Sequence, residues 1–294
     1  MLLTILFSLV PIIFLISIFI IGFSWYIASD SLKPVNLAKT KTPGDHQLPF
    51  ENFSVVSDGL TLKGWFIPVQ DASKKSKAPP IILTHGWGGN SEKMLPQAEY
   101  LNRAGFNIIL YDLRGHGDSD PVELTSLNRM LRDFDKIMEY VLSRAEVDEN
   151  AIGLMGHSIG AAASILKASQ DERVKAVVSS SSFADFDYLA EQTLRSRGLR
   201  RFPFQFFVKI FWRKLAGVAL ETISPVYQIG KIAIPLLLIH GDQDQVISAG
   251  EFEKLSQSAK KAEKFLIKGV GHSDLYLHTE FCKKTTDFFT SNLL

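Results

Sequence analysis

Short runs of consecutive apolar residues alternate with helical patterns along most of the chain. Most of these runs lack the polar alternation of a half-exposed strand, and they occupy residues 80–84, 107–111, 151–155, 174–178, 235–239 and 264–267. Strands that are apolar on both faces are typical of a parallel sheet covered by helices on both sides. Apolar residues recur at helical spacing between the runs, in segments 92–103, 127–144, 158–169, 250–260 and 275–290. This alternation predicts an α/β fold of βαβ units with a doubly wound sheet.

A hairpin precedes these units. Residues 53–57 and 60–67 are two strand-like runs, and the Asp58-Gly59 dipeptide between them favours a two-residue turn. Two antiparallel strands leading into six parallel ones predict an eight-stranded, mostly parallel sheet flanked by helices. The regular spacing breaks once, after the run that ends at residue 178. We therefore expect residues 183–228 to form a helical insertion that lies over the sheet as a cap.

The first 29 residues contain no charged side chain. A helix needs about 20 mostly apolar residues to cross a bilayer, and this stretch is long enough. A cleaved signal peptide would need a basic n-region and a shorter apolar core, and the stretch has neither. Trp25 and Tyr26 stand where an aromatic belt at the membrane surface would be expected. We predict an uncleaved transmembrane anchor at 1–29, with a signal peptide and a buried soluble helix as alternatives.

Residues 30–50 carry prolines, a glycine and scattered polar side chains, and predict a linker to a domain at 51–294. Three lysines follow the apolar stretch, Lys33, Lys39 and Lys41, whereas only the amino terminus precedes it. Basic residues tend to remain on the cytoplasmic side of a membrane. We therefore expect the domain to lie in the cytoplasm.

Composition narrows the range of functions. The 294 residues are enough for a large domain with a substantial core, and the net charge of +1 gives no indication of a nucleic-acid partner. The single cysteine, Cys282, leaves no possibility of an internal disulfide. No CxxC, HExxH, GxGxxG or P-loop pattern occurs in the chain. We therefore expect neither a metal ion nor a cofactor.

The motif Gly-His-Ser-Ile-Gly at residues 156–160 is the clearest candidate for chemistry. Gly-x-Ser-x-Gly alone is common by chance, but here it follows a predicted strand directly and opens a helical segment. Such a turn strains the serine backbone and exposes its Oγ, and the glycines let strand and helix approach. The helix N-terminus offers free N–H groups and positive potential to an oxyanion. Ser158 is the predicted nucleophile; an accidental glycine-rich turn is the alternative.

From about residue 53 to its end, the chain resembles the α/β-hydrolase superfamily. Four motifs carry the resemblance in order: HGWGG at 85–89, DLRGHGDS at 112–119, GHSIG at 156–160 and HGDQD at 240–244. The resemblance implies an α/β-hydrolase fold with a Ser-His-Asp triad. The predicted anchor and cap further resemble membrane-anchored bacterial hydrolases of the serine aminopeptidase-like or monoglyceride-lipase-like group.

In that superfamily the nucleophile is followed along the chain by the acid and then by the histidine. His272 comes just after the last predicted strand, at the carboxyl edge of the sheet, whereas His278 falls inside the next helical segment. Asp242 and Asp244 both follow the preceding strand. The spacing of the family motif selects Asp244 and leaves Asp242 as a turn residue. We expect Asp244 to orient His272, which takes the proton of the serine.

The resemblance also implies an oxyanion hole. The backbone N–H of Trp87 would be one donor, and the N–H of Ile159, the residue after the nucleophile, would be the other. The two glycines after Trp87 allow the tight turn that this loop needs. His85 is interpreted as a brace for the loop, and segment 112–119 as a glycine-rich turn stabilised by its own polar side chains.

Within the predicted cap, Pro203 precedes an apolar stripe at helical spacing. The stripe comprises Phe204, Phe207, Val208, Phe211, Trp212 and Leu215. Basic residues crowd around it: Arg195, Arg197, Arg200, Arg201, Lys209, Arg213 and Lys214. Two interpretations remain open, a lid helix packed on the catalytic pocket and a basic amphipathic helix on an anionic bilayer surface. Both suit an apolar acyl substrate that arrives from the membrane.

The expected function is hydrolysis of a carboxylic ester or thioester with an apolar acyl group, as in lipases and esterases. The expected partners are a small-molecule or lipid-like acyl substrate and the bilayer. An aminopeptidase or amidase is one alternative, because Asp187 or Glu191 in the cap could hold a substrate amine. An acyltransferase would pass the same acyl group to an alcohol. A membrane-anchored binding protein on an inactive scaffold is the non-enzymatic alternative, although no triad or oxyanion element is missing.

Overall fold

The computed structural model describes residues 2–69 and 77–294 of the chain. These residues form an eight-stranded sheet with strand order β1-β2-β4-β3-β5-β6-β7-β8. The strands are β1 (Glu51–Ser57), β2 (Leu60–Ile67), β3 (Pro80–Thr84), β4 (Asn107–Tyr111), β5 (Ile152–His157), β6 (Val174–Ser180), β7 (Leu236–Gly241) and β8 (Glu263–Ile267). β2 pairs antiparallel with β1 and β4, and all other neighbours are parallel. The predicted eight-stranded, mostly parallel sheet is confirmed.

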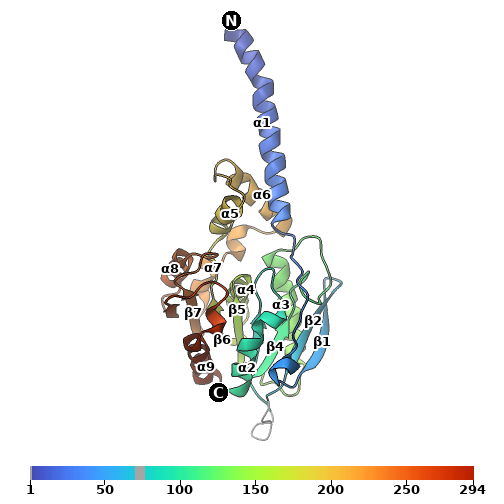
Figure 1. Ribbon diagram of the computed structural model, residues 1–294, viewed down its shortest axis with the longest axis vertical. Helices are drawn as coiled ribbons and strands as arrows, with labels where there is room; N and C mark the ends of the chain where they lie inside the picture. Colours follow the sequence, from blue (N-terminus) through green and yellow to red (C-terminus); the bar gives the residue numbers. More distant parts are fainter. Residues whose placement is uncertain (1, 70–76) are drawn as a thin grey trace.

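Helices cover both faces of this sheet (Figure 1). The helices of the described chain are α1 (Leu2–Asp30), α2 (Leu95–Arg103), α3 (Leu127–Leu142), α4 (Ile159–Ala168), α5 (Phe186–Arg195), α6 (Phe204–Ala216), α7 (Pro225–Gln228), α8 (Ala249–Ser258) and α9 (Thr279–Leu293); of these, α1 extends away from the sheet and α5 and α6 lie in the cap. Side chains of α2 and α9 share one core cluster, whereas α3, α4 and α8 contribute to a second cluster. The inner strands β3 to β7 are almost fully buried between these clusters, which explains their continuous apolar runs, whereas the edge strands β1 and β8 are largely exposed.

Two predicted helices begin later than their apolar patterns suggest. Segment 92–103 starts as the 3₁₀ turn η2 (Ser91–Met94), and α2 begins only at Leu95, next to a proline that suits a first turn. Segment 275–290 likewise starts as the 3₁₀ turn η5 (Leu275–Leu277). His278 has extended backbone angles and is the N-cap of α9. The prediction that His278 lies inside a helix is therefore wrong.

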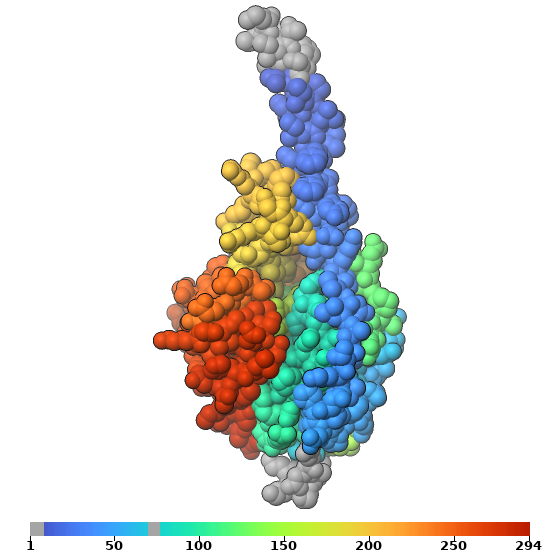
Figure 2. All heavy atoms as spheres, viewed as in Figure 1, coloured from blue at the N-terminus to red at the C-terminus, as the bar shows by residue number. Residues whose placement is uncertain are grey.

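The cap, residues 183–228, leaves the sheet after β6 and returns at β7. It contains α5, α6, α7 and the 3₁₀ turn η3 (Leu220–Ile223). The predicted apolar stripe of α6 is turned inward, with Val208 and Trp212 buried. Much of this inward face packs against the last turns of α1 rather than against a bilayer, and the space-filling view shows the yellow cap beside the blue helix (Figure 2).

α1 extends away from the sheet, and its C-terminal turns are built into the domain (Figure 1). By length and composition, Leu9–Asp30 could cross a membrane, with a mean hydropathy of 2.3. Ile27 and Ala28 are fully buried. The indole Nε1 of Trp212 donates to the Ala28 carbonyl at 3.2 Å and to the Ser31 hydroxyl at 3.0 Å. The end of the apolar helix therefore belongs to the same packed unit as the cap.

The segment predicted as a linker, 30–50, is held along the surface of the domain. The Lys39 ammonium lies 2.9 Å from a carboxylate oxygen of the buried Asp112 and 2.7 Å from Asp118. The Leu37 carbonyl accepts a hydrogen bond from the side chain of Asn90. The 3₁₀ turn η1 (Pro43–His46) follows. These bonds span more than fifty residues of sequence and fix where the chain runs between α1 and the sheet.

Candidate active site

Ser158 occupies the turn between β5 and α4. Its backbone has φ 56° and ψ −118°, a conformation that non-glycine residues adopt only at a cost of about 1–3 kcal/mol. A Cβ at Gly156 would lie 2.1 Å from the Gly160 carbonyl oxygen, and one at Gly160 would lie 2.2 Å from the Thr84 oxygen. Both glycines are therefore required by close backbone contact. The turn has the strained geometry that the sequence motif predicts.

The acid predicted by the motif spacing bonds to the predicted base. His272 Nδ1 lies 2.7 Å from Asp244 Oδ2, although 28 residues separate the two in sequence. The other carboxylate oxygen accepts N–H bonds from Val246 at 2.9 Å and Ile247 at 2.8 Å. Burial alone would raise the pKa of Asp244, but these bonds, led by the one from His272, outweigh it and lower that pKa. Asp244 is therefore ionised, which assigns the proton to His272 Nδ1 and leaves Nε2 free to act as a base.

Two further histidines surround this pair without carrying charge. His240 Nε2 lies 2.8 Å from the Ile247 carbonyl, and burial lowers its pKa. The ring of His157 lies 4.6 Å from the ring of His272. Burial, followed by the charge of His272, lowers the pKa of His157 to about 3. The Gly-x-Ser-x-Gly pattern does not specify the residue before the serine, yet the neutral ring of His157 packs against His272.

Ser158 and His272 line the same cavity, which has a volume of about 310 Å³. Among the described residues, no hydrogen bond joins Ser158 Oγ to His272. Such bonds are often long in unliganded enzymes and tighten when substrate binds. Asp242 is exposed and accepts the N–H of Gly269 at 2.6 Å, as expected of a turn residue. His278 does not line this cavity.

The loop after β3 brings Trp87 to the nucleophile. A Cβ at Gly86 would lie 3.3 Å from the Ser158 Cβ, so the loop passes very close to the serine. Trp87 lines both cavities that contain Ser158. Among the described residues, the backbone N–H groups of Trp87 and Ile159 have no acceptor within the chain. Both N–H groups are therefore available to an oxyanion, which is the role that the resemblance implies.

Two neutral histidines brace this loop. His85 Nε2 accepts the Leu113 N–H at 3.0 Å, and its Nδ1 lies 2.8 Å from the Gly86 carbonyl. Burial, with a contribution from His116, lowers the pKa of His85 to about 4. His116 Nε2 in turn accepts the Gly88 N–H at 3.2 Å, and burial lowers its pKa too. These contacts agree with the interpretation of His85 as a structural brace.

The Gly-rich segment 112–119 also stabilises this edge of the sheet. Asp112 accepts N–H bonds from Asp118 at 2.9 Å and from Ser91 at 2.7 Å. Burial would raise the pKa of Asp112, but the charge of Lys39 and the hydrogen bonds outweigh it and lower that pKa. Arg114 forms a buried ion pair with Asp133. The polar side chains of the segment are thus used in structure, as expected, although their bonds reach well beyond the turn itself.

A second cavity, of about 250 Å³, opens on the other side of Ser158. Its walls are mostly apolar and come from the cap, the end of α1 and the acid loop; they include Leu32, Phe183, Phe186, Leu189, Trp212, Ile223 and Ile247. The first cavity is more polar, with Lys93, His157, Ser273 and Tyr276 on its walls. Among the described residues, neither cavity has an aspartate or glutamate in its lining.

The two acidic cap residues considered for a substrate amine lie elsewhere. Asp187 forms an ion pair with Lys209, and Glu191 lies 3.3 Å from Arg201. Neither lines a cavity that contains Ser158. Within the described part of the chain, no group of three or more histidine, cysteine, aspartate or glutamate side chains could hold a metal ion.

Comparisons with known proteins agree with the α/β-hydrolase fold. A family model described as alpha/beta hydrolase fold matches residues 79–209. The Escherichia coli protein YfhR is 30% identical over 213 residues, which cover 71% of this chain and 68% of YfhR. The Mycobacterium tuberculosis protein Rv2307c is 26% identical over 271 residues, covering 90% of this chain and 87% of that protein. The esterase Pf2001 of Pyrococcus furiosus superimposes with a TM-score of 0.72 at 20% identity, over 90% of this chain and 98% of the esterase.

Proposed function

The chain belongs to the alpha/beta hydrolase fold family, and from this membership we propose that it is a serine hydrolase cleaving esters or thioesters of an apolar acyl group. One observation carries the proposal. The bond between Asp244 and His272 Nδ1 leaves His272 Nε2 free in the cavity that also contains Ser158. A nucleophile, a base and an acid that orients the base are the requirements of acyl transfer.

The proposed reaction has two halves. His272 Nε2 takes the proton of Ser158 Oγ as the oxygen attacks the carbonyl carbon, and the N–H groups of Trp87 and Ile159 stabilise the oxyanion. When the tetrahedral intermediate collapses, the same Nε2 gives its proton to the leaving alcohol or thiol. Water then attacks the acyl-enzyme with His272 as base, which releases the acid and restores Ser158. Asp244 remains ionised throughout and stabilises the charged imidazolium.

The two cavities support an assignment of substrate groups. The mostly apolar cavity suits an acyl chain, because burying each methylene contributes about 0.8 kcal/mol. The cavity with Lys93 and Tyr276 suits a polar leaving group and the attacking water. The absence of carboxylates from both linings favours an esterase over an aminopeptidase, which would need a negative partner for the substrate amine. An acyltransferase differs only in the acceptor that enters the polar cavity.

We also propose that α1 is a retained membrane anchor. Its last turns are buried against the cap, and Ser31 and Leu32 line the apolar cavity. Removing this helix as a signal peptide would take away the Ala28 carbonyl that accepts a hydrogen bond from Trp212, and would uncover the face of the cap on which α1 packs. The lysines after α1 favour a cytoplasmic domain.

A substrate screen tests the proposed activity. The full-length protein, in detergent or nanodiscs, is assayed on p-nitrophenyl esters of graded acyl length and on aminoacyl p-nitroanilides. We expect ester turnover that improves with acyl length, and loss of that turnover in Ser158→Ala. Ser169→Ala, at the other end of α4, is the matched control and should keep wild-type rates. Turnover of the anilides alone would support the peptidase, and no turnover of any substrate would support the inactive scaffold.

A further inference from the structure

The outer face of α6 exposes a second apolar stripe, formed by Phe202, Phe206 and Ile210. Phe202 stands in the turn just before α6 begins, and Phe206 and Ile210 are four apart and lie on one side of the helix. Their exposed fractions are 86%, 64% and 43%. This outer stripe is distinct from the inward stripe that packs against α1. Large apolar side chains grouped on a surface mark a contact with a partner or a membrane.

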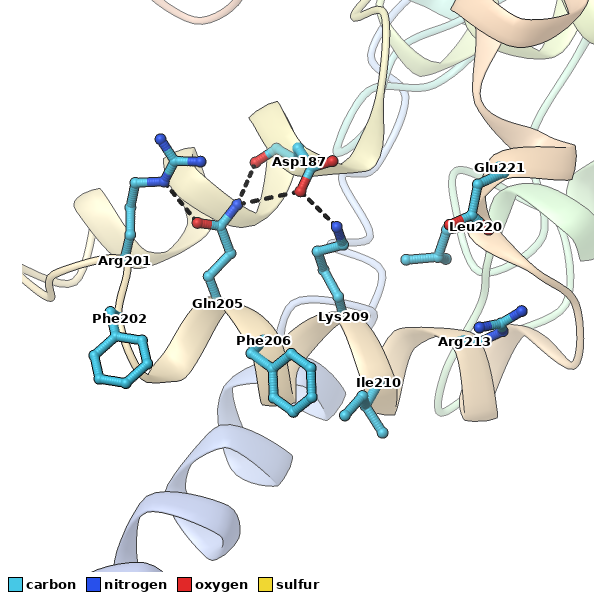
Figure 3. A pocket seen from close by; sticks show the side chains of 10 residues that line it. All are labelled: Asp187, Arg201, Phe202, Gln205, Phe206, Lys209, Ile210, Arg213, Leu220 and Glu221. Atoms are coloured by element: carbon cyan, nitrogen blue, oxygen red, sulfur yellow. Dashed lines mark hydrogen bonds and ion pairs between the residues drawn. The ribbon is translucent and has the colours of Figure 1, made fainter.

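The outer stripe points along the direction in which α1 leaves the cap. Figure 3 shows Phe202, Phe206 and Ile210 projecting from the side of α6 toward which α1 continues, with Arg201 and Lys209 on the opposite side. Ring contacts fix the two helices against each other: the ring centroids of Phe23 and Phe204 lie 5.9 Å apart, and those of Trp25 and Phe211 lie 5.2 Å apart. The stripe therefore holds a constant position relative to α1.

Helix length sets that position relative to a bilayer. The 29 residues of α1 are about 43 Å long at 1.5 Å per residue, whereas the hydrocarbon core is about 30 Å thick. If the N-terminal part of α1 fills that core, its last turns lie at the level of the lipid headgroups. Trp25 and Tyr26, which are 40% and 55% exposed, belong to these turns. α6 contacts the same turns, so the outer stripe also lies at headgroup level.

The charge around the stripe is positive. Residues 183–228 contain seven basic and four acidic side chains, a net charge of +3. Arg195, Arg200, Arg213 and Lys214 are exposed, and in the described part of the chain none of them has an acidic partner. A cavity of about 510 Å³ lies beside the stripe, lined by Arg201, Lys209 and Arg213 together with Asp187 and Glu221. Lys209 pairs with Asp187 and Arg201 pairs with Glu191, so among the described residues Arg213 is the lining cation without an acidic partner.

We propose that the outer face of α6 is an interfacial docking surface that holds the cap on a bilayer containing anionic phospholipids. The stripe inserts at the headgroup boundary, and the unpaired cations bind lipid phosphates. The proposal rests on the proposed function of α1 as an anchor, because the bilayer that α1 crosses is the one that the stripe contacts. The inner face of α6 lines the apolar cavity. Docking therefore places this cavity next to the membrane, which contains acyl lipids.

Depth measurements on the full chain test this proposal. In a Cys282→Ser background, single cysteines replace Phe206, Leu15 and Val56, each 64% exposed, and carry an environment-sensitive fluorophore. The protein is reconstituted in phosphatidylcholine vesicles with or without phosphatidylglycerol, and quenchers sit at known depths on the lipid chains. Labelling of Ser158 by a fluorophosphonate checks that each variant is folded.

The three positions separate the anchor from the docking surface. We expect deep quenchers to act at position 15, shallow quenchers to act at position 206, and neither to act at position 56. Quenching at 15 with none at 206 would overturn the docking surface and leave the anchor intact. No quenching at 15 would contradict the anchor and, with it, the docking proposal. A protected probe at 206 that lipid quenchers cannot reach would indicate a second copy on the stripe, and would also overturn the proposal.

Charge reversal tests the choice of anionic lipid. Arg200→Glu/Arg213→Glu should lower the quenching at position 206 at least about twofold in phosphatidylglycerol vesicles, and raised salt should have the same effect. Lys260→Glu/Lys261→Glu, distant from the cap in sequence, is the matched control and should change nothing. Equal quenching in the arginine variant and the wild type would contradict a role for lipid phosphates.

Discussion

Two cavities contain Ser158, and they differ in polarity and in the elements that line them. The apolar one is about 250 Å³ and is walled by the cap and the end of α1. The polar one is about 310 Å³ and is walled by loops of the sheet edge, with His272 among them. Trp87 and Ser158 line both. In the proposed function, the loops of the sheet edge carry the chemistry, whereas the inserted cap and the segment at the end of α1 select the acyl group.

The largest expected effect concerns the polar side. Asp244→Asn keeps the shape of the acid loop but favours the wrong tautomer of His272, so kcat on the best ester should fall about 10⁴-fold. Asp242→Asn is the matched control on the same loop and should change kcat less than about threefold, since Asp242 only caps a turn. Steady-state kinetics measure both variants. A loss of less than tenfold in Asp244→Asn would remove Asp244 from the proposed triad.

Acid should destabilise the fold through His85, which braces the loop that contributes Trp87 to both cavities. The pKa of His85 is about 4 in the folded protein, against an ordinary histidine value of 6.5, so the unfolded chain takes up the proton first as pH falls. The contribution of His85 to the free energy of unfolding should therefore be constant above pH 6.5 and drop by on the order of 3 kcal/mol between pH 6.5 and 4. Buried His157, whose pKa is lowered to about 3, adds to the loss of stability over the same range.

Chemical denaturation across that pH range measures the slope. His85→Gln retains an acceptor and a donor but cannot be protonated, so its stability should depend less steeply on pH. His46→Gln is the control, because His46 is a partly exposed histidine of segment 30–50, between α1 and the sheet. An unchanged slope in His85→Gln would show that the acid sensitivity arises elsewhere.

A smaller effect is expected on the apolar side. Leu32→Trp adds bulk to the wall supplied by the residues just after α1, so kcat/KM for long acyl chains should fall about tenfold while short-chain esters are unaffected. Leu37→Trp is the matched control. Leu37 lies on the same segment, 30–50, but is 47% exposed, so its replacement should leave the chain-length profile unchanged. A uniform loss over all chain lengths in Leu32→Trp would contradict an acyl-binding role for this cavity.

Much of the polar side could be predicted from sequence because local rules determine it. The predicted bounds of β3 and β4 match those of the structure, since each is a continuous apolar run buried on both faces. Gly156 is required by its contact with the Gly160 backbone four residues away, and Gly160 by its contact with the Thr84 backbone on the neighbouring strand β3. Family spacing selects Asp244 over Asp242, and the structure joins Asp244, not Asp242, to His272.

The apolar side depends on contacts that no local pattern contains. The inward stripe of α6 is predictable from its spacing, but its main partner, the end of α1, is more than 180 residues away. α6 is apolar both on its inward side and on its outer side, where Phe206 and Ile210 are exposed. The spacing of apolar residues predicts only the inward stripe, which is the more continuous of the two. Lys39 has the pattern of an exposed linker residue, yet it forms an ion pair with the buried Asp112, 73 residues away. The helical prediction for His278 fails because apolar periodicity runs unbroken through the turn where the helix begins.

The central claim is that Ser158 is the acyl-accepting nucleophile between the two cavities. Its most direct test is intact-mass and peptide mapping after reaction of the full-length protein with a fluorophosphonate. We predict a single adduct on the peptide that contains Ser158, no adduct in Ser158→Ala, and slower labelling in Asp244→Asn. An adduct on a different residue, or labelling that persists in Ser158→Ala, would contradict the account.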